Sequence, residues 1–250
     1  MNKNSNTYTF IYASVMVILV AAALAFVNGA LKEKQKKNVE VDKMSQILSS
    51  VSLYPAYSEA EALYAQVVTA AYIVNNQGET VSEDAAQAFA VEMSAEMAKP
   101  AAERQLPVYE ACIDGQVKYI LPLYGAGLWG PIWGYISLDA DANTVYSASF
   151  SHASETPGLG AEITTEKFQA PFTGKHIFVD GTFRSLAVLK AGAKADNQEY
   201  VDAISGGTCT SRGVEEMLYN CLSVYEPFFR GLQQAAPADS CAEETQTVED

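Results

Sequence analysis

The sequence has few basic residues and few metal-binding residues for its length. Only 16 Lys and Arg stand against 30 Asp and Glu among 250 residues, so the formal net charge is −14. Nucleic-acid binding requires clustered basic side chains that displace counterions from phosphate, and this balance argues against it. The four cysteines form no C-x-x-C pair, and the two histidines are far apart in sequence. No zinc or iron–sulfur signature is therefore present, and we expect no metal site.

Motifs of common hydrolases and nucleotide-binding enzymes are also missing. The sequence contains no G-x-S-x-G, no Walker A loop and no pair of carboxylates at a convincing spacing. Residues 125–130 read G-A-G-L-W-G, which matches the dinucleotide fingerprint G-x-G-x-x-G. That fingerprint has to open a helix, whereas here Pro131 and a strand-like run follow it. We therefore disfavour a dinucleotide site and assign no catalytic residue.

Charge is absent from the N-terminal region. No charged residue occurs from Asn4 through Leu31, and a helix over residues 8–31 would rise about 36 Å, enough to cross a bilayer core of about 30 Å. We predict a short tail over residues 1–7 and a transmembrane helix over 8–31. The alternative is a cleaved signal peptide, which is disfavoured because the apolar run exceeds the usual length of about 7–15 residues.

Lysines are distributed unequally about this span. Lys3 precedes it, whereas Lys32, Lys34, Lys36 and Lys37 follow it. Taken alone, the positive-inside rule would keep the rest of the chain in the cytoplasm.

The remainder has the pattern of an α+β domain with mainly antiparallel sheet and flanking helices. We expect a charged stalk over residues 32–57, helical to about residue 50, a domain over 58–232, and an acidic disordered tail over 233–250. Helices are predicted over 58–74, 82–98 and 211–232. Hairpins are predicted over 107–113 with 116–124 and over 132–138 with 144–150, the second through a polar turn at 139–143, and further strands over 176–179 and 185–190.

One segment combines glycines with a hydroxyl where a helix is expected. Residues 202–211 read D-A-I-S-G-G-T-C-T-S. On spacing alone this is a tight turn followed by a helix N-cap. It also fits an anion site, because exposed amides and the positive end of a helix dipole favour phosphate. Gly206 and Gly207 would leave the Thr208 hydroxyl accessible to a bulky group.

This segment resembles the flavinylation motif S-G-A-T of the sodium-translocating NADH:quinone oxidoreductases, shared with the Rnf complex. The resemblance implies that a separate flavin transferase, using FAD, joins FMN to Thr208 by a phosphoester, with Ser205 completing the motif. The chain has Gly207 where the family usually has alanine, and Ala203 where glycine is common.

A second signature supports the first. Residues 152–160 read H-A-S-E-T-P-G-L-G, close to the family's E-T-P-G-L-G, although a Pro-Gly type II turn alone would explain the pattern. The resemblance implies that the flavin ring is approached by Glu155, Thr156, Gly158 and Leu159, and that Lys190 also lines the site. Trp129, in a G-L-W-G stretch similar to the family's C subunits, would shield the flavin. The alternatives are a solvated strand-end lysine at Lys190 and core packing of Trp129 and Trp133.

The resemblance implies an electron-carrier subunit, anchored in the bacterial inner membrane by one span, with its FMN-binding domain on the periplasmic side. Partner subunits A, B, D, E and F would pass electrons from NADH to quinone while sodium crosses the membrane. A long domain can cross a membrane despite flanking lysines, so the family's placement is preferred. Two alternatives stay open: the G subunit of an Rnf complex, and an anchored extracytoplasmic binding or scaffold protein without flavin.

Overall fold

The computed structural model describes residues 6–235 in two compact units, one ending at Lys43 and the other beginning at Met44. The expectations for residues 1–5 and for the acidic tail from residue 236 onward lie outside the described residues.

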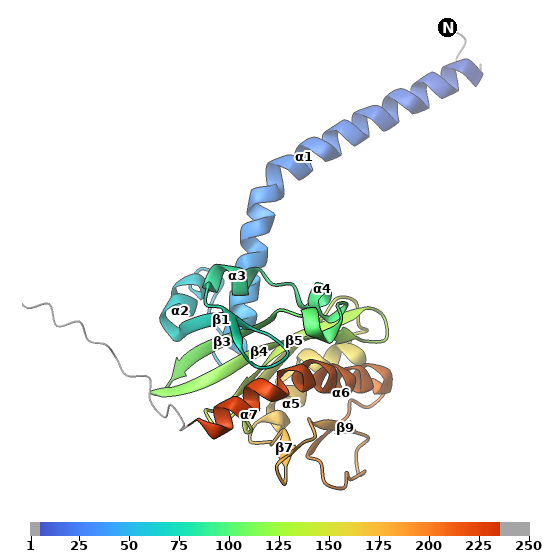
Figure 1. Ribbon diagram of the computed structural model, residues 1–250. Coiled ribbons are helices and arrows are strands. Elements are labelled where there is room, and N and C mark those ends of the chain that lie inside the picture. The colour runs from blue at the N-terminus through green and yellow to red at the C-terminus, as the bar shows by residue number, and fades with distance from the viewer. Residues whose placement is uncertain (1–5, 236–250) are drawn as a thin grey trace, which may run out of the picture. The chain divides into compact units, whose positions relative to one another are not determined.

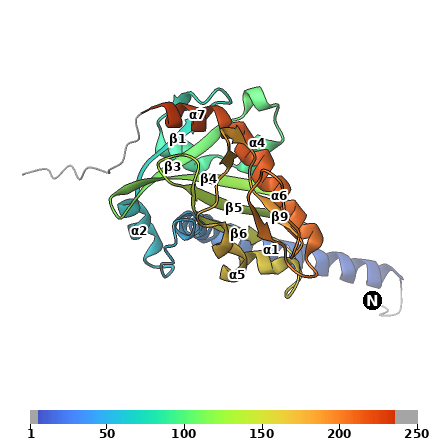
Figure 2. The same ribbon diagram turned by 90° about the horizontal axis from the view of Figure 1, so that it is seen from below.

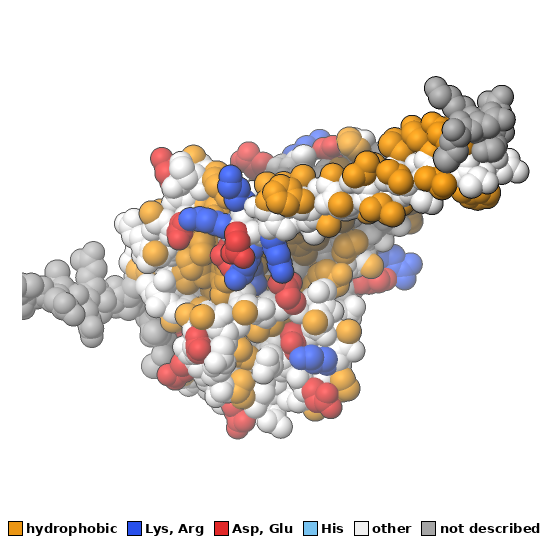
Figure 3. Space-filling model, turned by 90° about the horizontal axis from the view of Figure 1, so that it is seen from above, with side chains coloured by type: hydrophobic (Ala, Val, Ile, Leu, Met, Phe, Trp, Pro, Cys, Tyr) orange, Lys and Arg blue, Asp and Glu red, His pale blue; other side chains and the backbone are white. Residues whose placement is uncertain are grey.

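The first unit is helical. Helix α1 spans Asn6–Ser49, so the predicted helix continues through the charged segment into the start of the second unit. By length and composition, α1 is a candidate membrane span. Its apolar side chains are exposed, with Phe10 at 75% and Phe26 at 77%, and Figure 3 shows the hydrophobic side chains along it. Lipid is the surrounding that would make such exposure favourable.

The second unit is built on a six-stranded antiparallel sheet in the order β2-β1-β3-β4-β5-β6 (Figures 1 and 2). The strands are β1 Val68–Val74, β2 Thr80–Ser82, β3 Leu106–Ile113, β4 Gln116–Ala126, β5 Pro131–Leu138 and β6 Val145–His152. The fold class predicted for the domain, an antiparallel sheet with flanking helices, is confirmed.

Both faces of the sheet are covered, because alternate side chains of a strand point to opposite faces. In β4, Leu121 and Leu123 belong to a large core packed beneath α6 and α7, whereas Ile120 belongs to a smaller core on the other face. Helices α6 Thr208–Leu222 and α7 Glu226–Gln234 lie on the first side. Helices α2 Ala60–Val67 and α3 Ala85–Ala90, with the end of α1, lie on the second (Figure 1).

Shorter elements complete the unit. Parallel strands β9 Ala187–Leu189 and β10 Tyr200–Asp202 form a separate pair, and β10 leads directly into the turn before α6. The others are α4 Met93–Met97, α5 Glu166–Gln169, β7 Phe178–Val179, β8 Thr182–Phe183 and the 3-10 helices Ala101–Glu103, Gly160–Thr164, Ala170–Phe172 and Ser223–Tyr225.

Both predicted hairpins are confirmed. The first turns at Asp114 and Gly115, whose φ angles of 52° and 77° are the two positive values that a type I′ turn requires. In the second, the Asp141 side chain accepts hydrogen bonds from the backbone N–H groups of Asn143 and Thr144 at 2.9 and 2.8 Å. The polar turn thus supplies its own acceptor.

Three helix predictions need correction. Only residues 60–67 of the predicted helix 58–74 are helical, because Val68–Val74 pairs with β3 as a strand. The predicted helix 82–98 is two short helices that begin after Asp84 and Glu92, and the Asp84 side chain caps the first. The last helix begins at Thr208, three residues before the predicted start at Ser211, and is interrupted at Ser223–Tyr225.

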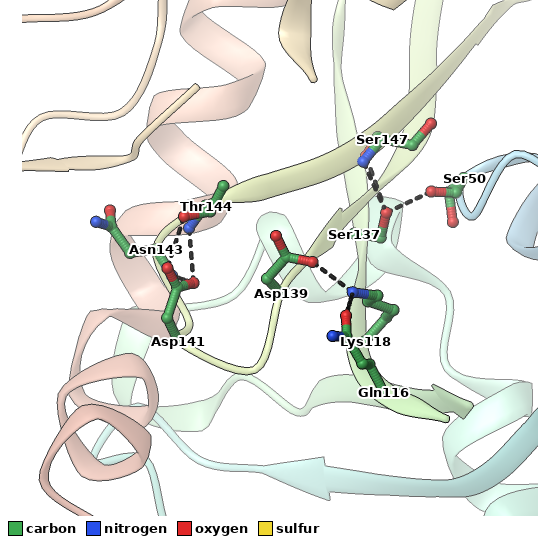
Figure 4. A network of polar contacts seen from close by, with 9 residues as sticks. All are labelled: Ser50, Gln116, Lys118, Ser137, Asp139, Asp141, Asn143, Thr144 and Ser147. Carbon is green, nitrogen blue, oxygen red and sulfur yellow. Dashed lines mark hydrogen bonds and ion pairs between the residues drawn. The ribbon is translucent and has the colours of Figure 1, made fainter. Parts of the chain in front are cut away.

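A polar network joins strands β4 to β6 beneath the end of α1 (Figure 4). The buried Lys118 ammonium donates to Asp139 Oδ1 at 2.6 Å and to Gln116 Oε1 at 2.9 Å. The Ser137 hydroxyl donates to the Ser50 carbonyl and accepts from the backbone N–H of Ser147. These buried polar groups are therefore satisfied, as a stable core requires.

Candidate functional site at the start of helix α6

The turn that precedes α6 is fixed by its own hydrogen bonds. The Gly207 N–H donates to the Ile204 carbonyl at 3.0 Å, and Gly206 has a φ of 79°, in the region that favours glycine. The Ser211 hydroxyl accepts from the Ile204 N–H at 3.0 Å, which ties the turn to the helix. The sequence S-G-G therefore forms a defined bend immediately before the first helical residue.

Thr208 is that first residue, and its side chain is exposed. Gly207 occupies the N-cap position, and no side chain caps the helix. The alternative interpretation, in which the Thr208 hydroxyl is only a helix cap, is therefore wrong. Within residues 6–235, no protein group makes a hydrogen bond with this hydroxyl, which leaves it accessible.

The second signature lies against this turn. The Leu159 N–H donates to the Thr156 carbonyl at 3.1 Å across Pro157 and Gly158, and Gly158 has a φ of 76°, so these residues form a type II turn. The turn places Leu159 over Gly206, where an added β-carbon would lie only 2.7 Å from Leu159 Cδ2. The two motifs, distant in sequence, are thus in contact.

A small cavity of about 120 Å³ lies between the two motifs. Most of the predicted site residues line it: Trp129, Glu155, Thr156, Leu159, Gly206, Gly207 and Thr208. Leu128, Cys209, Gly160 and Thr210 also line it and were not predicted. Gly158 does not line this cavity, and its role is to form the turn that positions Leu159.

A larger cavity of about 970 Å³ lies on the other side of Thr208, along α6 and β9. Lys190, Ser205, Gly206 and Thr208 line it, so the structure brings these predicted residues together as well. Lys190 is exposed at the end of β9, which fits the site and the solvated alternative equally. Sequence reasoning missed the other basic and aromatic side chains of this cavity: Arg184, Arg212, Phe183 and Tyr219.

Glu155 connects the parts of the site. Its side chain is buried, at 5% exposure. Oε1 accepts from the Trp129 N–H at 2.9 Å, and Oε2 accepts from the Thr210 hydroxyl at 2.7 Å. Thr210 was not predicted, although helical periodicity of about 100° per residue turns it away from Thr208 and toward the interior.

The glycine-rich loop forms the outer wall. Gly127 to Gly130 connect β4 to β5 as a hairpin, with the Gly127 N–H donating to the Gly130 carbonyl at 2.8 Å. Because a strand follows and not a helix, the dinucleotide interpretation is excluded. Trp129 is 67% exposed, so core packing does not explain it, whereas the half-buried Trp133 donates from Nε1 to Gln46 Oε1 at 2.9 Å.

Helix α6 is attached to β4 by its buried cysteine. The Cys221 thiol donates to the Tyr124 carbonyl at 3.3 Å, and burial raises the pKa of this thiol to about 11. The other free cysteine among residues 6–235, Cys209, is exposed beside Thr208. The thiol of Cys221 therefore acts as a packed, neutral contact that holds the helix in place.

Together these features suit a phosphorylated aromatic group attached to a hydroxyl. Two glycines remove side chains from the approach to Thr208, and the positive end of a 15-residue helix favours phosphate. Basic and aromatic side chains, together with Glu215 and Glu216, line a cavity whose volume of about 970 Å³ falls within the range of ligand sites. The residues present thus fit FMN, which the resemblance implies. Among residues 6–235, no group of His, Cys, Asp and Glu that could hold a metal is found.

The chain matches a known family of flavin-binding domains. Residues 127–223, which contain both motifs and the Trp129 loop, match the family model for an FMN-binding domain. The chain is also 36% identical over 235 residues to the C subunit of the Na(+)-translocating NADH-quinone reductase of Pasteurella multocida, covering 85% of this chain and 88% of that one. The chain therefore belongs to the family of C subunits of the Na(+)-translocating NADH-quinone reductases.

Two further relatives agree with this assignment. The protein of the same name from Pseudomonas aeruginosa is 33% identical over 242 residues, covering 87% of this chain and 92% of that one. The crystal structure of the C subunit from Parabacteroides distasonis is 52% identical, covers 80% of this chain and 96% of that one, and superimposes with a TM-score of 0.74.

Proposed function

We propose that this chain is the flavin-carrying, electron-relay subunit of a Na⁺-pumping NADH:quinone oxidoreductase, with FMN joined to Thr208 by a phosphoester. Its partners would be subunits A, B, D, E and F of that complex. The relatives carry the name of the reductase's C subunit, which favours this function over the Rnf alternative. The observation that carries the proposal is the exposed hydroxyl of Thr208 at the start of α6, between two cavities.

Accessibility supports Thr208 over its neighbours as the attachment residue. Thr210 and Ser211 are each 1% exposed, and their hydroxyls make hydrogen bonds to Glu155 and to the Ile204 N–H. Ser205 is exposed like Thr208, but it lies in the turn before the helix. Among these hydroxyl residues, Thr208 alone combines exposure with a position at the positive end of the helix dipole.

The attachment reaction is balanced with FAD as the donor. A flavin transferase would join Thr208 Oγ1 to the FMN phosphorus, and the pyrophosphate bond of FAD would break. AMP would leave, and the threonine hydroxyl would lose its proton. The chain contributes an accessible hydroxyl, side-chain-free glycines and backbone N–H groups at the helix start.

The bound flavin would supply the redox chemistry, and the protein would hold it and limit its contact with water. Trp129 and Leu159, both exposed at the small cavity, would cover part of the ring. We assign no acid, base or nucleophile, because electron relay requires none.

Flavin fluorescence on a denaturing gel tests the proposal. The full chain, produced with the transferase, should give a fluorescent band, and Thr208→Ala should abolish it. Thr164→Ala is the matched control, because it removes an exposed threonine hydroxyl that lines neither cavity, and it should leave the band bright. A dark wild-type band would favour the scaffold alternative, and a fluorescent Thr208→Ala band would place the attachment on another residue.

We further propose a single-span inner-membrane anchor with the domain on the periplasmic side. Support comes from α1 as a candidate span and from the family resemblance. In this proposal, residues 8–31 lie in lipid, 32–57 form the stalk, 58–232 form the FMN-binding domain and 233–250 form the tail.

A further inference from the structure

Glu155 has an unusual environment for an acidic side chain. It is buried, and both of its carboxyl oxygens accept hydrogen bonds, one from the Trp129 N–H and one from the Thr210 hydroxyl. Its own N–H donates to His152 Nδ1 at 3.2 Å. A buried acidic group is stable only when hydrogen bonds replace its lost hydration, so these contacts are required where it lies.

The backbone of Gly127 and Gly160 packs closely around the Glu155 carboxyl group. A β-carbon added to Gly127 would contact Glu155 Oε1, and one added to Gly160 would contact both Oε2 and the Thr210 hydroxyl oxygen. Three segments, the loop after β4, the turn after β6 and the first turn of α6, therefore converge on one side chain. Ser154 reinforces the same junction, because its hydroxyl donates to the Trp129 carbonyl at 2.9 Å.

We propose that Glu155 is a positioning residue that holds the Trp129 loop against the first turn of α6. It acts through Thr210 on one side and through the Trp129 backbone on the other, and so fixes the exposed Trp129 side chain beside Thr208. The same contact keeps the second threonine of T-C-T turned inward, which leaves Thr208 as the accessible one. Its role toward the flavin rests on the function proposed above, whereas the junction itself does not.

Hydrogen exchange measures the junction without any flavin. Thr210→Val keeps the shape of the side chain and removes the hydroxyl that donates to Glu155 Oε2. The substitution leaves the Trp129 N–H and its acceptor, Glu155 Oε1, chemically unchanged. Exchange of the Trp129 amide in the full chain should rise about tenfold in this variant, because Glu155 loses one of its two tethers. Thr210→Ser restores a donor and should return the rate to within about twofold of wild type.

The hairpin β3–β4 provides the internal control, because its amides should exchange at the wild-type rate in all three proteins. An unchanged exchange rate of the Trp129 amide in Thr210→Val would contradict the proposal that Glu155 holds the two segments together. So would equal acceleration in Thr210→Val and Thr210→Ser.

Iodide quenching of the bound flavin tests the role toward the cofactor. If the junction holds Trp129 beside Thr208, the quenching constant should rise about twofold or more in Thr210→Val and recover in Thr210→Ser. Faster amide exchange with unchanged quenching would overturn the positioning role. A wild-type chain without flavin would instead contradict the attachment to Thr208, and the exchange measurement would still decide the junction.

Discussion

Single glycines decide how closely the segments of the site approach one another. Gly207, where the family usually has alanine, has a negative φ of −106°. An added methyl group there would lie 2.9 Å from Ile204 Cγ2, on the β-branch of a half-buried side chain, and 3.3 Å from the backbone carbonyl carbon of Leu159, so the apolar neighbours must shift by a few tenths of an ångström. Gly160 differs, because its added methyl group would meet the Glu155 carboxyl group and the Thr210 hydroxyl, which are buried and hydrogen-bonded.

We therefore expect different costs for the same substitution at these two glycines. Gly207→Ala should lower the free energy of unfolding by less than about 1 kcal/mol and keep the flavin, whereas Gly160→Ala should lower it by about 2 kcal/mol or more. Urea titration of both variants measures the difference. Equal destabilisation would show that the junction around Glu155 is not closely packed.

At the residue scale, the sequence predicted which residues line the site but not the hydrogen bonds between them. Thr208 and the E-T-P-G-L-G segment were found through resemblance, and in the structure both line the small cavity. The Glu155–Thr210 contact was not predicted, because it joins residues 55 positions apart through the sheet and the helix. No local pattern records such a contact.

At the scale of elements, local turn chemistry was a good guide and apolar runs were not. Asp114-Gly115 specifies its hairpin, since few other residue pairs accept two positive φ angles. The run Val68–Val74 was predicted as helix, yet it contains the β-branched residues that favour strands, and its pairing with β3 decides the outcome. That pairing is not local, so periodicity within the segment cannot reveal it.

An ion-pair cluster lies beside β10, the strand that leads into the turn before α6. Glu199 accepts from His176 Nδ1 at 2.6 Å and lies 3.5 Å from the Lys175 ammonium. Burial acts to raise the pKa of Glu199, but the hydrogen bond and charge of His176, with the charge of Lys175, outweigh it and lower the pKa below 4.5. The cluster thus stabilises the fold above pH 4.5 and loses this contribution as pH falls through the lowered value.

Glu199→Gln should therefore destabilise the protein at neutral pH by less than about 1 kcal/mol, because the cluster is partly exposed. The difference from wild type should shrink progressively below pH 4.5. Thermal unfolding of both proteins across this pH range provides the measurement. A difference that grows on acidification would contradict the assigned direction of the pKa shift.

At the scale of the whole molecule, composition predicted the division into an apolar helix and an acidic α+β domain. It did not settle the side of the membrane, because the lysines after the span and the family resemblance point in opposite directions. The competing forces are the cost of moving a cluster of basic residues across the bilayer and the ability of long domains, with their partners, to cross regardless.

An introduced cysteine tests the proposed placement. Lys194 is exposed in the domain, so Lys194→Cys, combined with Cys209→Ser, offers one accessible new thiol. We expect an impermeant maleimide to label it in cells whose outer membrane has been permeabilised. The Cys209→Ser chain alone sets the background. Labelling that appears only after the inner membrane is broken would place the domain in the cytoplasm.

The central claim is a covalent bond between Thr208 and FMN, and mass spectrometry tests it most directly. Trypsin should release residues 195–212 as one peptide, which contains Ser205, Thr208, Thr210 and Ser211. From the native protein, we expect this peptide to carry the mass of FMN less one water, with fragment ions that localise the addition to Thr208. An unmodified peptide from protein made with the transferase, or an addition on another hydroxyl, would contradict the claim.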